Sequence, residues 1–260
     1  EDAPSAKNYE AMTAAVEPAR LQLIRRLNQT HDATAKLVAM REDLIQFLSK
    51  HSDLGKLNVD FKHLFASWFN RGFLVLRPIN WSSPAHILEK IITYESVHEI
   101  KNWDDLRRRL QPEDRRCFAF FHPAMPDEPL IFVEVALTKG TPNSIQSVLL
   151  ENRDAMAAEK ADTAAFYSIS NCQAGLAGIS FGNSLIKTVV QHLLRELPQI
   201  RNFVTLSPIP GLVKWLRENG NFDADATAET HRHLAAYYLL NAKHHNGQPR
   251  DPVARFHLNN

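Results

Sequence analysis

Residues 166–197 read FYSISNCQAGLAGISFGNSLIKTVVQHLLREL, and this stretch predicts a strand, a glycine-bearing turn and a helix in that order. Residues 164–170 mix small, aromatic and β-branched side chains, which is typical of a short, buried strand. From Leu185 onward, apolar residues recur at helical spacing until Pro198 ends the run, which is typical of an amphipathic helix. The turn between strand and helix carries three glycines: Gly175, Gly178 and Gly182.

A glycine-bearing turn that leads into a helix is suited to holding an anion. Glycine lets the backbone approach a phosphate closely, and the first N–H groups of a helix have no partner inside it. The turn matches neither GxxxxGK[ST] nor a clean GxGxxG, so the common nucleotide-binding patterns are absent. An ordinary turn, in which the glycines only relieve steric crowding, stays open as the alternative interpretation.

Composition sets the protein class. The chain has 260 residues, 44% of them hydrophobic and 23% charged, and a formal net charge of +1, which is ordinary for a globular protein and gives no electrostatic case for nucleic acid. Two cysteines are too few for a disulfide framework, and no apolar run is long enough for a membrane helix or a signal peptide. The chain starts at Glu1 without a methionine and is expected to have been trimmed. We therefore expect a soluble, cytoplasmic protein with no membrane partner.

The pattern of apolar residues changes near residue 70, from helical spacing to a mixture of strand-like and helical stretches. Residues 1–70 contain amphipathic stretches at 9–27, 34–48 and 59–69, which predict helices that either form an oligomerisation module or complete the main core. Beyond them, strands are predicted at 73–77, 117–122, 130–137 and 202–207 and helices at 85–94, 102–110, 145–150 and 212–218. Proline-rich residues 123–129 predict a hairpin loop of six or seven residues.

Two further stretches carry candidate catalytic residues. The strand at 202–207 ends in SPIPG, and Pro208 restricts Ser207 to extended backbone at the carboxyl end of a buried strand, where ligands lie in open α/β sheets. The alternative is that Ser207 caps the helix that follows. His257 lies in the apolar segment DPVARFHL, where a lone histidine is more often a core residue than a catalytic one. No HExxH motif or cysteine pair is present, so no metal site is expected.

Together, FYSISNCQAGLAGISFGNSLIK, TLSPIPG and DPVARFHL, in this order, resemble the malonyl-CoA decarboxylase family, particularly its bacterial form. FASWFNRGFLVLRPINWSSPAHILEKII and RRCFAFFHPAMPDEPLIFVEVAL resemble the same family, so the likeness runs from about Met40 onward. It implies an α+β protein: a helical oligomerisation domain at residues 1–70, followed at residues 71–260 by a catalytic domain with the mixed sheet of the GNAT (acetyltransferase-like) fold. Two departures are a shorter segment at 217–232 and an end soon after His257.

The resemblance also implies the site and its chemistry. The family's catalytic serine and histidine match Ser207 and His257, and its CoA-binding loop, which follows the central strand, matches Ala177, Gly178, Ile179, Ser180, Phe181, Gly182 and Asn183. The implied reaction converts malonyl-CoA to acetyl-CoA and CO2 through a thioester enolate. It needs no cofactor, because the thioester is the electron sink. A homo-oligomer, either a tetramer or a dimer of dimers, is expected. A GNAT-type acyl-CoA transferase and a non-catalytic CoA-binding module are the alternatives.

Overall fold

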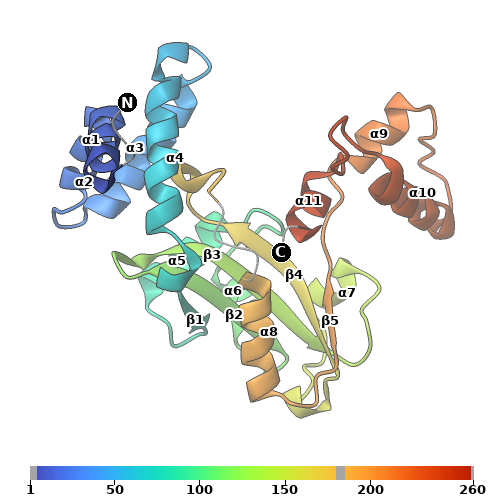
Figure 1. Ribbon diagram of the computed structural model, residues 1–260. Helices are drawn as coiled ribbons and strands as arrows, with labels where there is room; N and C mark the ends of the chain where they lie inside the picture. Colours follow the sequence, from blue (N-terminus) through green and yellow to red (C-terminus); the bar gives the residue numbers. More distant parts are fainter. Residues whose placement is uncertain (1–4, 180–184, 259–260) are drawn as a thin grey trace.

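The computed structural model describes residues 5–179 and 185–258, and Figure 1 shows it as a sheet with helices gathered at its upper edge. The N-terminal region is helical throughout: α1 (Ala6–Val16), α2 (Ala19–Leu27), α3 (Ala33–Phe47) and α4 (Gly55–Trp68). The later helices are α5 (Ala85–Tyr94), α6 (Trp103–Leu110), α7 (Ile145–Leu149), α8 (Leu185–Glu196), α9 (Leu212–Glu218), α10 (Ala228–Asn241) and α11 (Pro252–Leu258).

The described residues form one five-stranded sheet with the order β1-β2-β3-β4-β5. Its strands are β1 (Val75–Ile79), β2 (Arg115–His122), β3 (Met125–Thr138), β4 (Thr163–Asn171) and β5 (Asn202–Thr205). The first four strands pair antiparallel, whereas β4 and β5 pair parallel, and a parallel pair needs a crossover connection, which α8 provides. A mixed sheet after a helical N-terminal region confirms the predicted fold class. The middle strand is β3, however, not the β4 that precedes the glycine turn.

Helices cover both faces of the sheet (Figure 1). On one face, α8 buries Val189 and Leu193 against apolar side chains of β2, β3 and β4. On the other face, α5 and α6 pack over Phe121 and Phe132. The N-terminal helices have an apolar cluster of their own, in which Phe61 and Phe65 of α4 contact Leu176 and Ile179, which follow β4. The helical region is therefore packed against the turn after β4.

The neighbouring strands β4 and β5 separate at the point where β4 carries a bulge. Glu134 pairs with Ser168 and Val135 pairs with Phe166, so Tyr167 is an extra residue on β4. The β4–β5 pairing ends at this level, with Leu206 N–H donating to Phe166 O at 2.8 Å, and Ser207 comes next in the chain. The bulge and the end of β5 therefore coincide, and they bring Ser207 to the point where the two strands part.

Buried polar groups support β4 from the side covered by α5 and α6. Ser168 Oγ donates to Glu95 Oε2 at 2.7 Å, and Arg109 Nη1 lies 3.3 Å from Glu134 Oε2. Glu134 is fully buried, and this burial raises its pKa to about 8 against the opposing attraction of Arg109. These paired groups tie β3 and β4 to the helices beneath the bulge.

The predicted hairpin loop at residues 123–129 is wrong. β3 begins at Met125, and His122 pairs with Met125, so the turn is much shorter. The register then shifts until Phe121 pairs with Pro129, which leaves the prolines at an irregularity where no ladder N–H is needed. Lys90 of α5 holds this irregular stretch through Asp127 O at 2.8 Å, a contact that comes from a distant helix.

The prediction of a buried strand before Ser207 also needs correction. β5 ends at Thr205, and its residues are half-buried or exposed because only β4 lies beside it in the sheet. The apolar residues of β5 therefore belong to an edge strand that follows α8 in the crossover, and not to a strand in the middle of the sheet.

Candidate active site

Two segments that are distant in the sequence meet just beyond β5. Ser207 Oγ lies 2.8 Å from His257 Nε2, although 50 residues separate the two in the chain. Both residues are half-buried, and the tautomer of the imidazole decides which group donates. In Figure 1 the helix that carries His257, α11, lies above the ends of β4 and β5. The structure thus brings the two predicted catalytic residues into direct contact; their roles stay a prediction.

His257 is expected to be uncharged near neutral pH. Burial lowers its pKa below the ordinary value of 6.5, because the charged imidazolium loses solvation there. A neutral imidazole keeps one N–H and one lone pair, so it can accept the Ser207 hydroxyl proton through one nitrogen or donate from it. The neutral pair can therefore exchange the roles of hydrogen-bond donor and acceptor without a buried net charge.

Asp251 connects the turn after Ser207 to the helix that carries His257. Its side chain is buried, and Oδ1 accepts from the N–H groups of Val253 and Ala254 at 2.9 and 3.0 Å, as an N-cap of α11 does. Oδ2 accepts from Gly211 N–H at 3.2 Å, within the SPIPG turn. Sequence reasoning missed this link. Aspartate followed by proline is a recognisable helix start, but its second partner lies 40 residues away.

Replacing Asp251 with alanine is expected to lower the turnover that depends on the Ser207–His257 pair by tenfold or more. The loss of the cap should cost about 1 kcal/mol of stability. Without the Gly211 contact, the SPIPG turn is no longer held to α11, so Ser207 and His257 should lose their fixed distance. Steady-state kinetics test this against Thr227→Ala, which removes the N-cap of α10 but no contact to the SPIPG turn. Equal turnover in the two variants would show that Asp251 is only a helix cap.

The predicted CoA loop is described in part. Ala177, Gly178 and Ile179 follow a short 3₁₀ helix, Ala174–Leu176, whereas Ser180, Phe181, Gly182 and Asn183 lie outside the described residues. Gly178 has φ +73°, a left-handed conformation that favours glycine. This segment leaves the same edge of the sheet as the one that carries Ser207 (Figure 1).

Helix α3 holds the start of this loop. Arg41 is buried, and its guanidinium donates to Gly175 O at 2.6 Å and to Ala177 O at 2.8 Å. A Cβ added to Gly175 would lie 2.0 Å from the carbonyl oxygen of Val38, so only glycine fits there. The loop is therefore clamped to the helical region by hydrogen bonds and by direct backbone contact.

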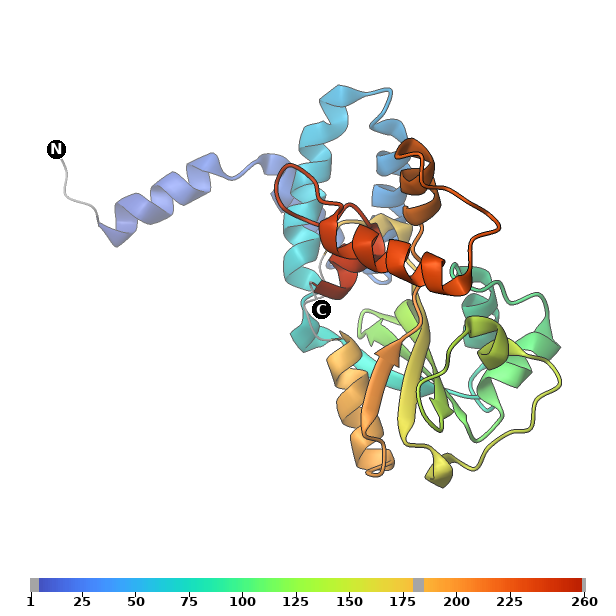
Figure 2. The ribbon, with the colours of Figure 1, turned by 90° about the vertical axis from the view of Figure 1, so that its right-hand side faces the viewer.

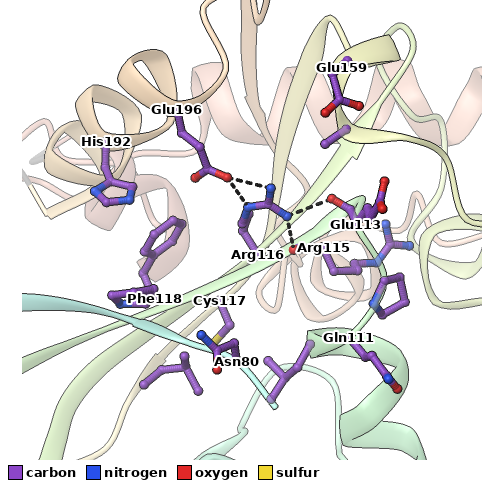
Figure 3. A pocket seen from close by; sticks show the side chains of 15 residues that line it. Asn80, Gln111, Glu113, Arg115, Arg116, Cys117, Phe118, Glu159, His192 and Glu196 are labelled. Carbon is purple, nitrogen blue, oxygen red and sulfur yellow. Dashed lines mark hydrogen bonds and ion pairs between the residues drawn. The ribbon is translucent and has the colours of Figure 1, made fainter. Parts of the chain in front are cut away.

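Figure 3 shows a cavity of about 480 Å³. The start of β2 lines it and pairs through β3 with the start of β4, so the cavity lies at the end of the sheet opposite to Ser207. It is lined by the start of β2, the end of β1 and the last turns of α8, and it contains none of the predicted site residues. Arg116 crosses it to Glu196, with Nη2–Oε1 at 2.6 Å, and so fixes the end of α8 on β2. This ion pair links β2 to α8, which indicates a structural role for Arg116 and Glu196.

In residues 5–179 and 185–258, three or more His, Cys, Asp or Glu side chains nowhere gather in a way that would hold a metal ion. None of the helices in these ranges has the length and apolar character needed to cross a membrane.

Family models and known proteins match almost the whole chain. Residues 1–69 match the malonyl-CoA decarboxylase N-terminal domain, and residues 72–232 and 220–260 match the C-terminal domain. The mitochondrial malonyl-CoA decarboxylase of Anser anser anser is 37% identical over 289 residues, which cover 92% of this chain and 57% of that protein. The enzyme of Mus musculus is 33% identical and covers 95% of this chain. The chain spans 57–60% of the length of these curated relatives.

Solved structures give the same result. The malonyl-CoA decarboxylase of Rhodopseudomonas palustris superposes with a TM-score of 0.89 at 52% identity, over 98% of this chain and 68% of that one. The protein of Agrobacterium vitis gives 0.89 at 51% identity, with the same coverage of both chains. Both family domains and these identities lead to one conclusion: this chain belongs to the malonyl-CoA decarboxylase family.

Proposed function

We propose that this chain converts malonyl-CoA to acetyl-CoA and CO2. The observation that carries the proposal is the 2.8 Å contact between Ser207 and His257, which two family motifs bring together at the edge of the sheet. A hydroxyl and an imidazole supply what the reaction asks of a protein: a hydrogen-bond donor and a proton source.

The reaction consumes one proton in each turnover, and water returns that proton to the side chain that donates it. The bond between C2 and the carboxylate carbon breaks, CO2 leaves, and the electron pair moves into the thioester carbonyl to give an enolate. A preorganised donor stabilises the enolate oxygen, and C2 then takes one proton. Family resemblance suggests His257 as proton donor and Ser207 as acceptor in the relay, whereas chemistry alone favours Ser207 as donor to the enolate oxygen. The thioester is the electron sink, so no further cofactor enters the proposal.

Incubation of the purified protein with malonyl-CoA alone tests the activity. We expect acetyl-CoA and CO2 in equal amounts without any acceptor. CoA release that requires an added amine or alcohol would identify an acyl transferase instead, and CoA binding without turnover would identify a binding module.

The CoA moiety is proposed to lie on the loop after β4, with its pyrophosphate accepting hydrogen bonds from backbone N–H groups within residues 177–183. Three features support this: the left-handed Gly178, the rigid attachment through Arg41, and the helix that follows. Both cysteines, Cys117 and Cys172, are buried and free, which supports work in a reducing compartment such as the cytoplasm.

We also propose that the helices of residues 1–70 form a domain that joins copies of the chain into a tetramer or a dimer of dimers. Figure 2 shows α1 extending away from the rest of the molecule, and none of its residues is buried. Its apolar side chains Tyr9, Met12 and Val16 are 67%, 58% and 74% exposed. A lone helix of this length is marginal in water, so a second copy that covers these side chains would stabilise it.

Replacing Met12 and Val16 together with aspartate is expected to reduce the molecular mass in solution, because charge would oppose burial of α1 between copies. Light scattering after size exclusion measures this. Leu240→Asp, on the equally exposed surface of α10, is the control. An unchanged mass in the α1 variant would assign the helix another role.

A further inference from the structure

The C-terminal helices α9, α10 and α11 lie together beyond the ends of β4 and β5 (Figure 1). A helix on the surface of a protein core usually buries a stripe of apolar side chains. In α10, which the structure describes in full, Tyr238 is the only buried residue, whereas Tyr237 and Leu240 are exposed. This one side chain therefore shows where α10 is attached to the rest of the molecule.

Tyr238 is attached to the last residue of the SPIPG turn. A Cβ added to Gly211 would lie 2.1 Å from the Tyr238 hydroxyl oxygen, so the hydroxyl fills the space that a side chain there would need. The same Cβ would lie 3.4 Å from Asp251 Oδ2, which accepts from Gly211 N–H. The ring of Tyr238 packs on Trp215 of α9, with the ring centroids 5.3 Å apart. A hydroxyl from α10 and the carboxylate that caps α11 thus contact the same glycine.

The Tyr238 hydroxyl is neutral in this position. Burial, and to a smaller extent the charge of Asp251, raises the pKa of Tyr238 above its ordinary value of 10. The hydroxyl therefore stays protonated at physiological pH, and no charge on it repels the Asp251 carboxylate.

A movement of Gly211 would reach both members of the candidate catalytic pair. Two prolines lie between Ser207 and Gly211, and their rings fix the backbone φ, so the turn is stiff. In the other direction, Asp251 joins Gly211 to the N-terminus of α11, the helix that carries His257. Gly211 is therefore the point at which the two segments of the site are connected.

We propose, on the basis of the proposed function, that Tyr238 is a positioning residue for decarboxylation. Its hydroxyl keeps Gly211 against Asp251. This contact holds the Ser207–His257 pair at its hydrogen-bond distance of 2.8 Å. Tyr238 touches no reacting atom in this assignment. A misplacement of about 1 Å can cost about 10²-fold in rate, so a contact outside the reacting pair can control turnover.

The kinetic test compares Tyr238→Phe with Tyr237→Phe, which removes the same hydroxyl from an exposed position on the same helix. Tyr238→Phe keeps the ring on Trp215, and a cooperative melting transition confirms that the variant is folded. With malonyl-CoA we expect kcat to fall about tenfold in Tyr238→Phe, with KM within about twofold of the unaltered value. Tyr237→Phe should match the unaltered protein.

A second pair of variants tests the contact with Gly211 directly. Gly211→Ala should lower kcat by at least about tenfold, because its Cβ displaces the Tyr238 hydroxyl. That hydroxyl is absent when Tyr238→Phe is added to Gly211→Ala, so the double variant should be faster than Gly211→Ala alone. A double variant that is equally slow or slower would show that the contact does not control the pair.

Nuclear magnetic resonance separates this assignment from the proposed function, because it needs no turnover. The nitrogen chemical shift of His257 Nε2 at neutral pH reports the hydrogen bond to Ser207, and Ser207→Ala gives the shift for its loss. Tyr238→Phe should move the signal toward that value, whereas Tyr237→Phe should not. An unmoved signal, or equal kcat in the two tyrosine variants, would overturn the assignment. If the unaltered protein shows no turnover, the proposed function fails, and the signal still decides whether Tyr238 positions the pair.

Discussion

Replacing Ser207 with alanine, or His257 with asparagine, is expected to lower kcat for malonyl-CoA by at least about a hundredfold in each case. A positioned acid or base contributes about 10²–10⁴-fold, and an oxyanion donor contributes a comparable factor. CoA affinity should change far less, because neither side chain is proposed to hold the nucleotide. Since the two groups share a 2.8 Å hydrogen bond and act as one unit, the double variant should be little slower than the slower single variant.

The control for this experiment is His245→Asn, at an exposed position in the same C-terminal part of the chain. It should keep normal turnover. If Ser207→Ala or His257→Asn also keeps near-normal turnover while folded, that residue has no place in the mechanism.

The pH profile distinguishes the two roles of His257. Its pKa lies below 6.5, so the neutral form prevails at neutral pH and is lost only on further acidification. If the neutral imidazole is the working form, kcat/KM should fall as the pH drops through that lowered pKa, and this limb should be missing in His257→Asn. A rate that rises on acidification would instead identify the imidazolium as the proton donor.

The second large effect is expected at Gly175. Alanine there would place a Cβ 2.0 Å from Val38 O, so α3 and the loop must move apart and strain the two Arg41 hydrogen bonds. We expect a loss of at least about 2 kcal/mol in the free energy of unfolding, which corresponds to a melting temperature lower by roughly 4–8 °C for a chain of this size. CoA should also bind more weakly, because its loop loses its attachment.

Gly55→Ala is the matched control, because no heavy atom lies within 4 Å of an added Cβ at that helical position. It should leave stability equal or slightly increased, since alanine favours helix. Differential scanning calorimetry on both variants makes the comparison. Equal melting temperatures would show that the contact between Gly175 and Val38 does not join the helical region to the loop.

Local signals in the sequence were enough for most of the helices. The bounds of α5, α8 and α9 follow from apolar periodicity together with proline and glycine, and α6 begins after Asn102, whose side chain accepts from Asp105 N–H at 2.9 Å. These signals involve residues that are only one or two helical turns apart, so they can be recognised from the sequence alone. The candidate pair Ser207 and His257 came from family motifs, because neither residue has a local pattern that marks it as catalytic.

Tertiary structure alone decided the contacts that run across the fold. Arg41 reaches Gly175 over 134 residues, and Asp251 reaches Gly211 over 40. The prolines of β3 predict a loop, but they lie within a strand, because the register shifts there and Lys90 binds the carbonyl of Asp127. Whether a strand lies at the edge or in the middle of the sheet depends on which strands pair with it. A buried carboxylate or guanidinium meets its partner only when segments that are distant in the sequence pack together. The sequence by itself determined most of the helices and the family, whereas packing decided which distant segments meet at the candidate site.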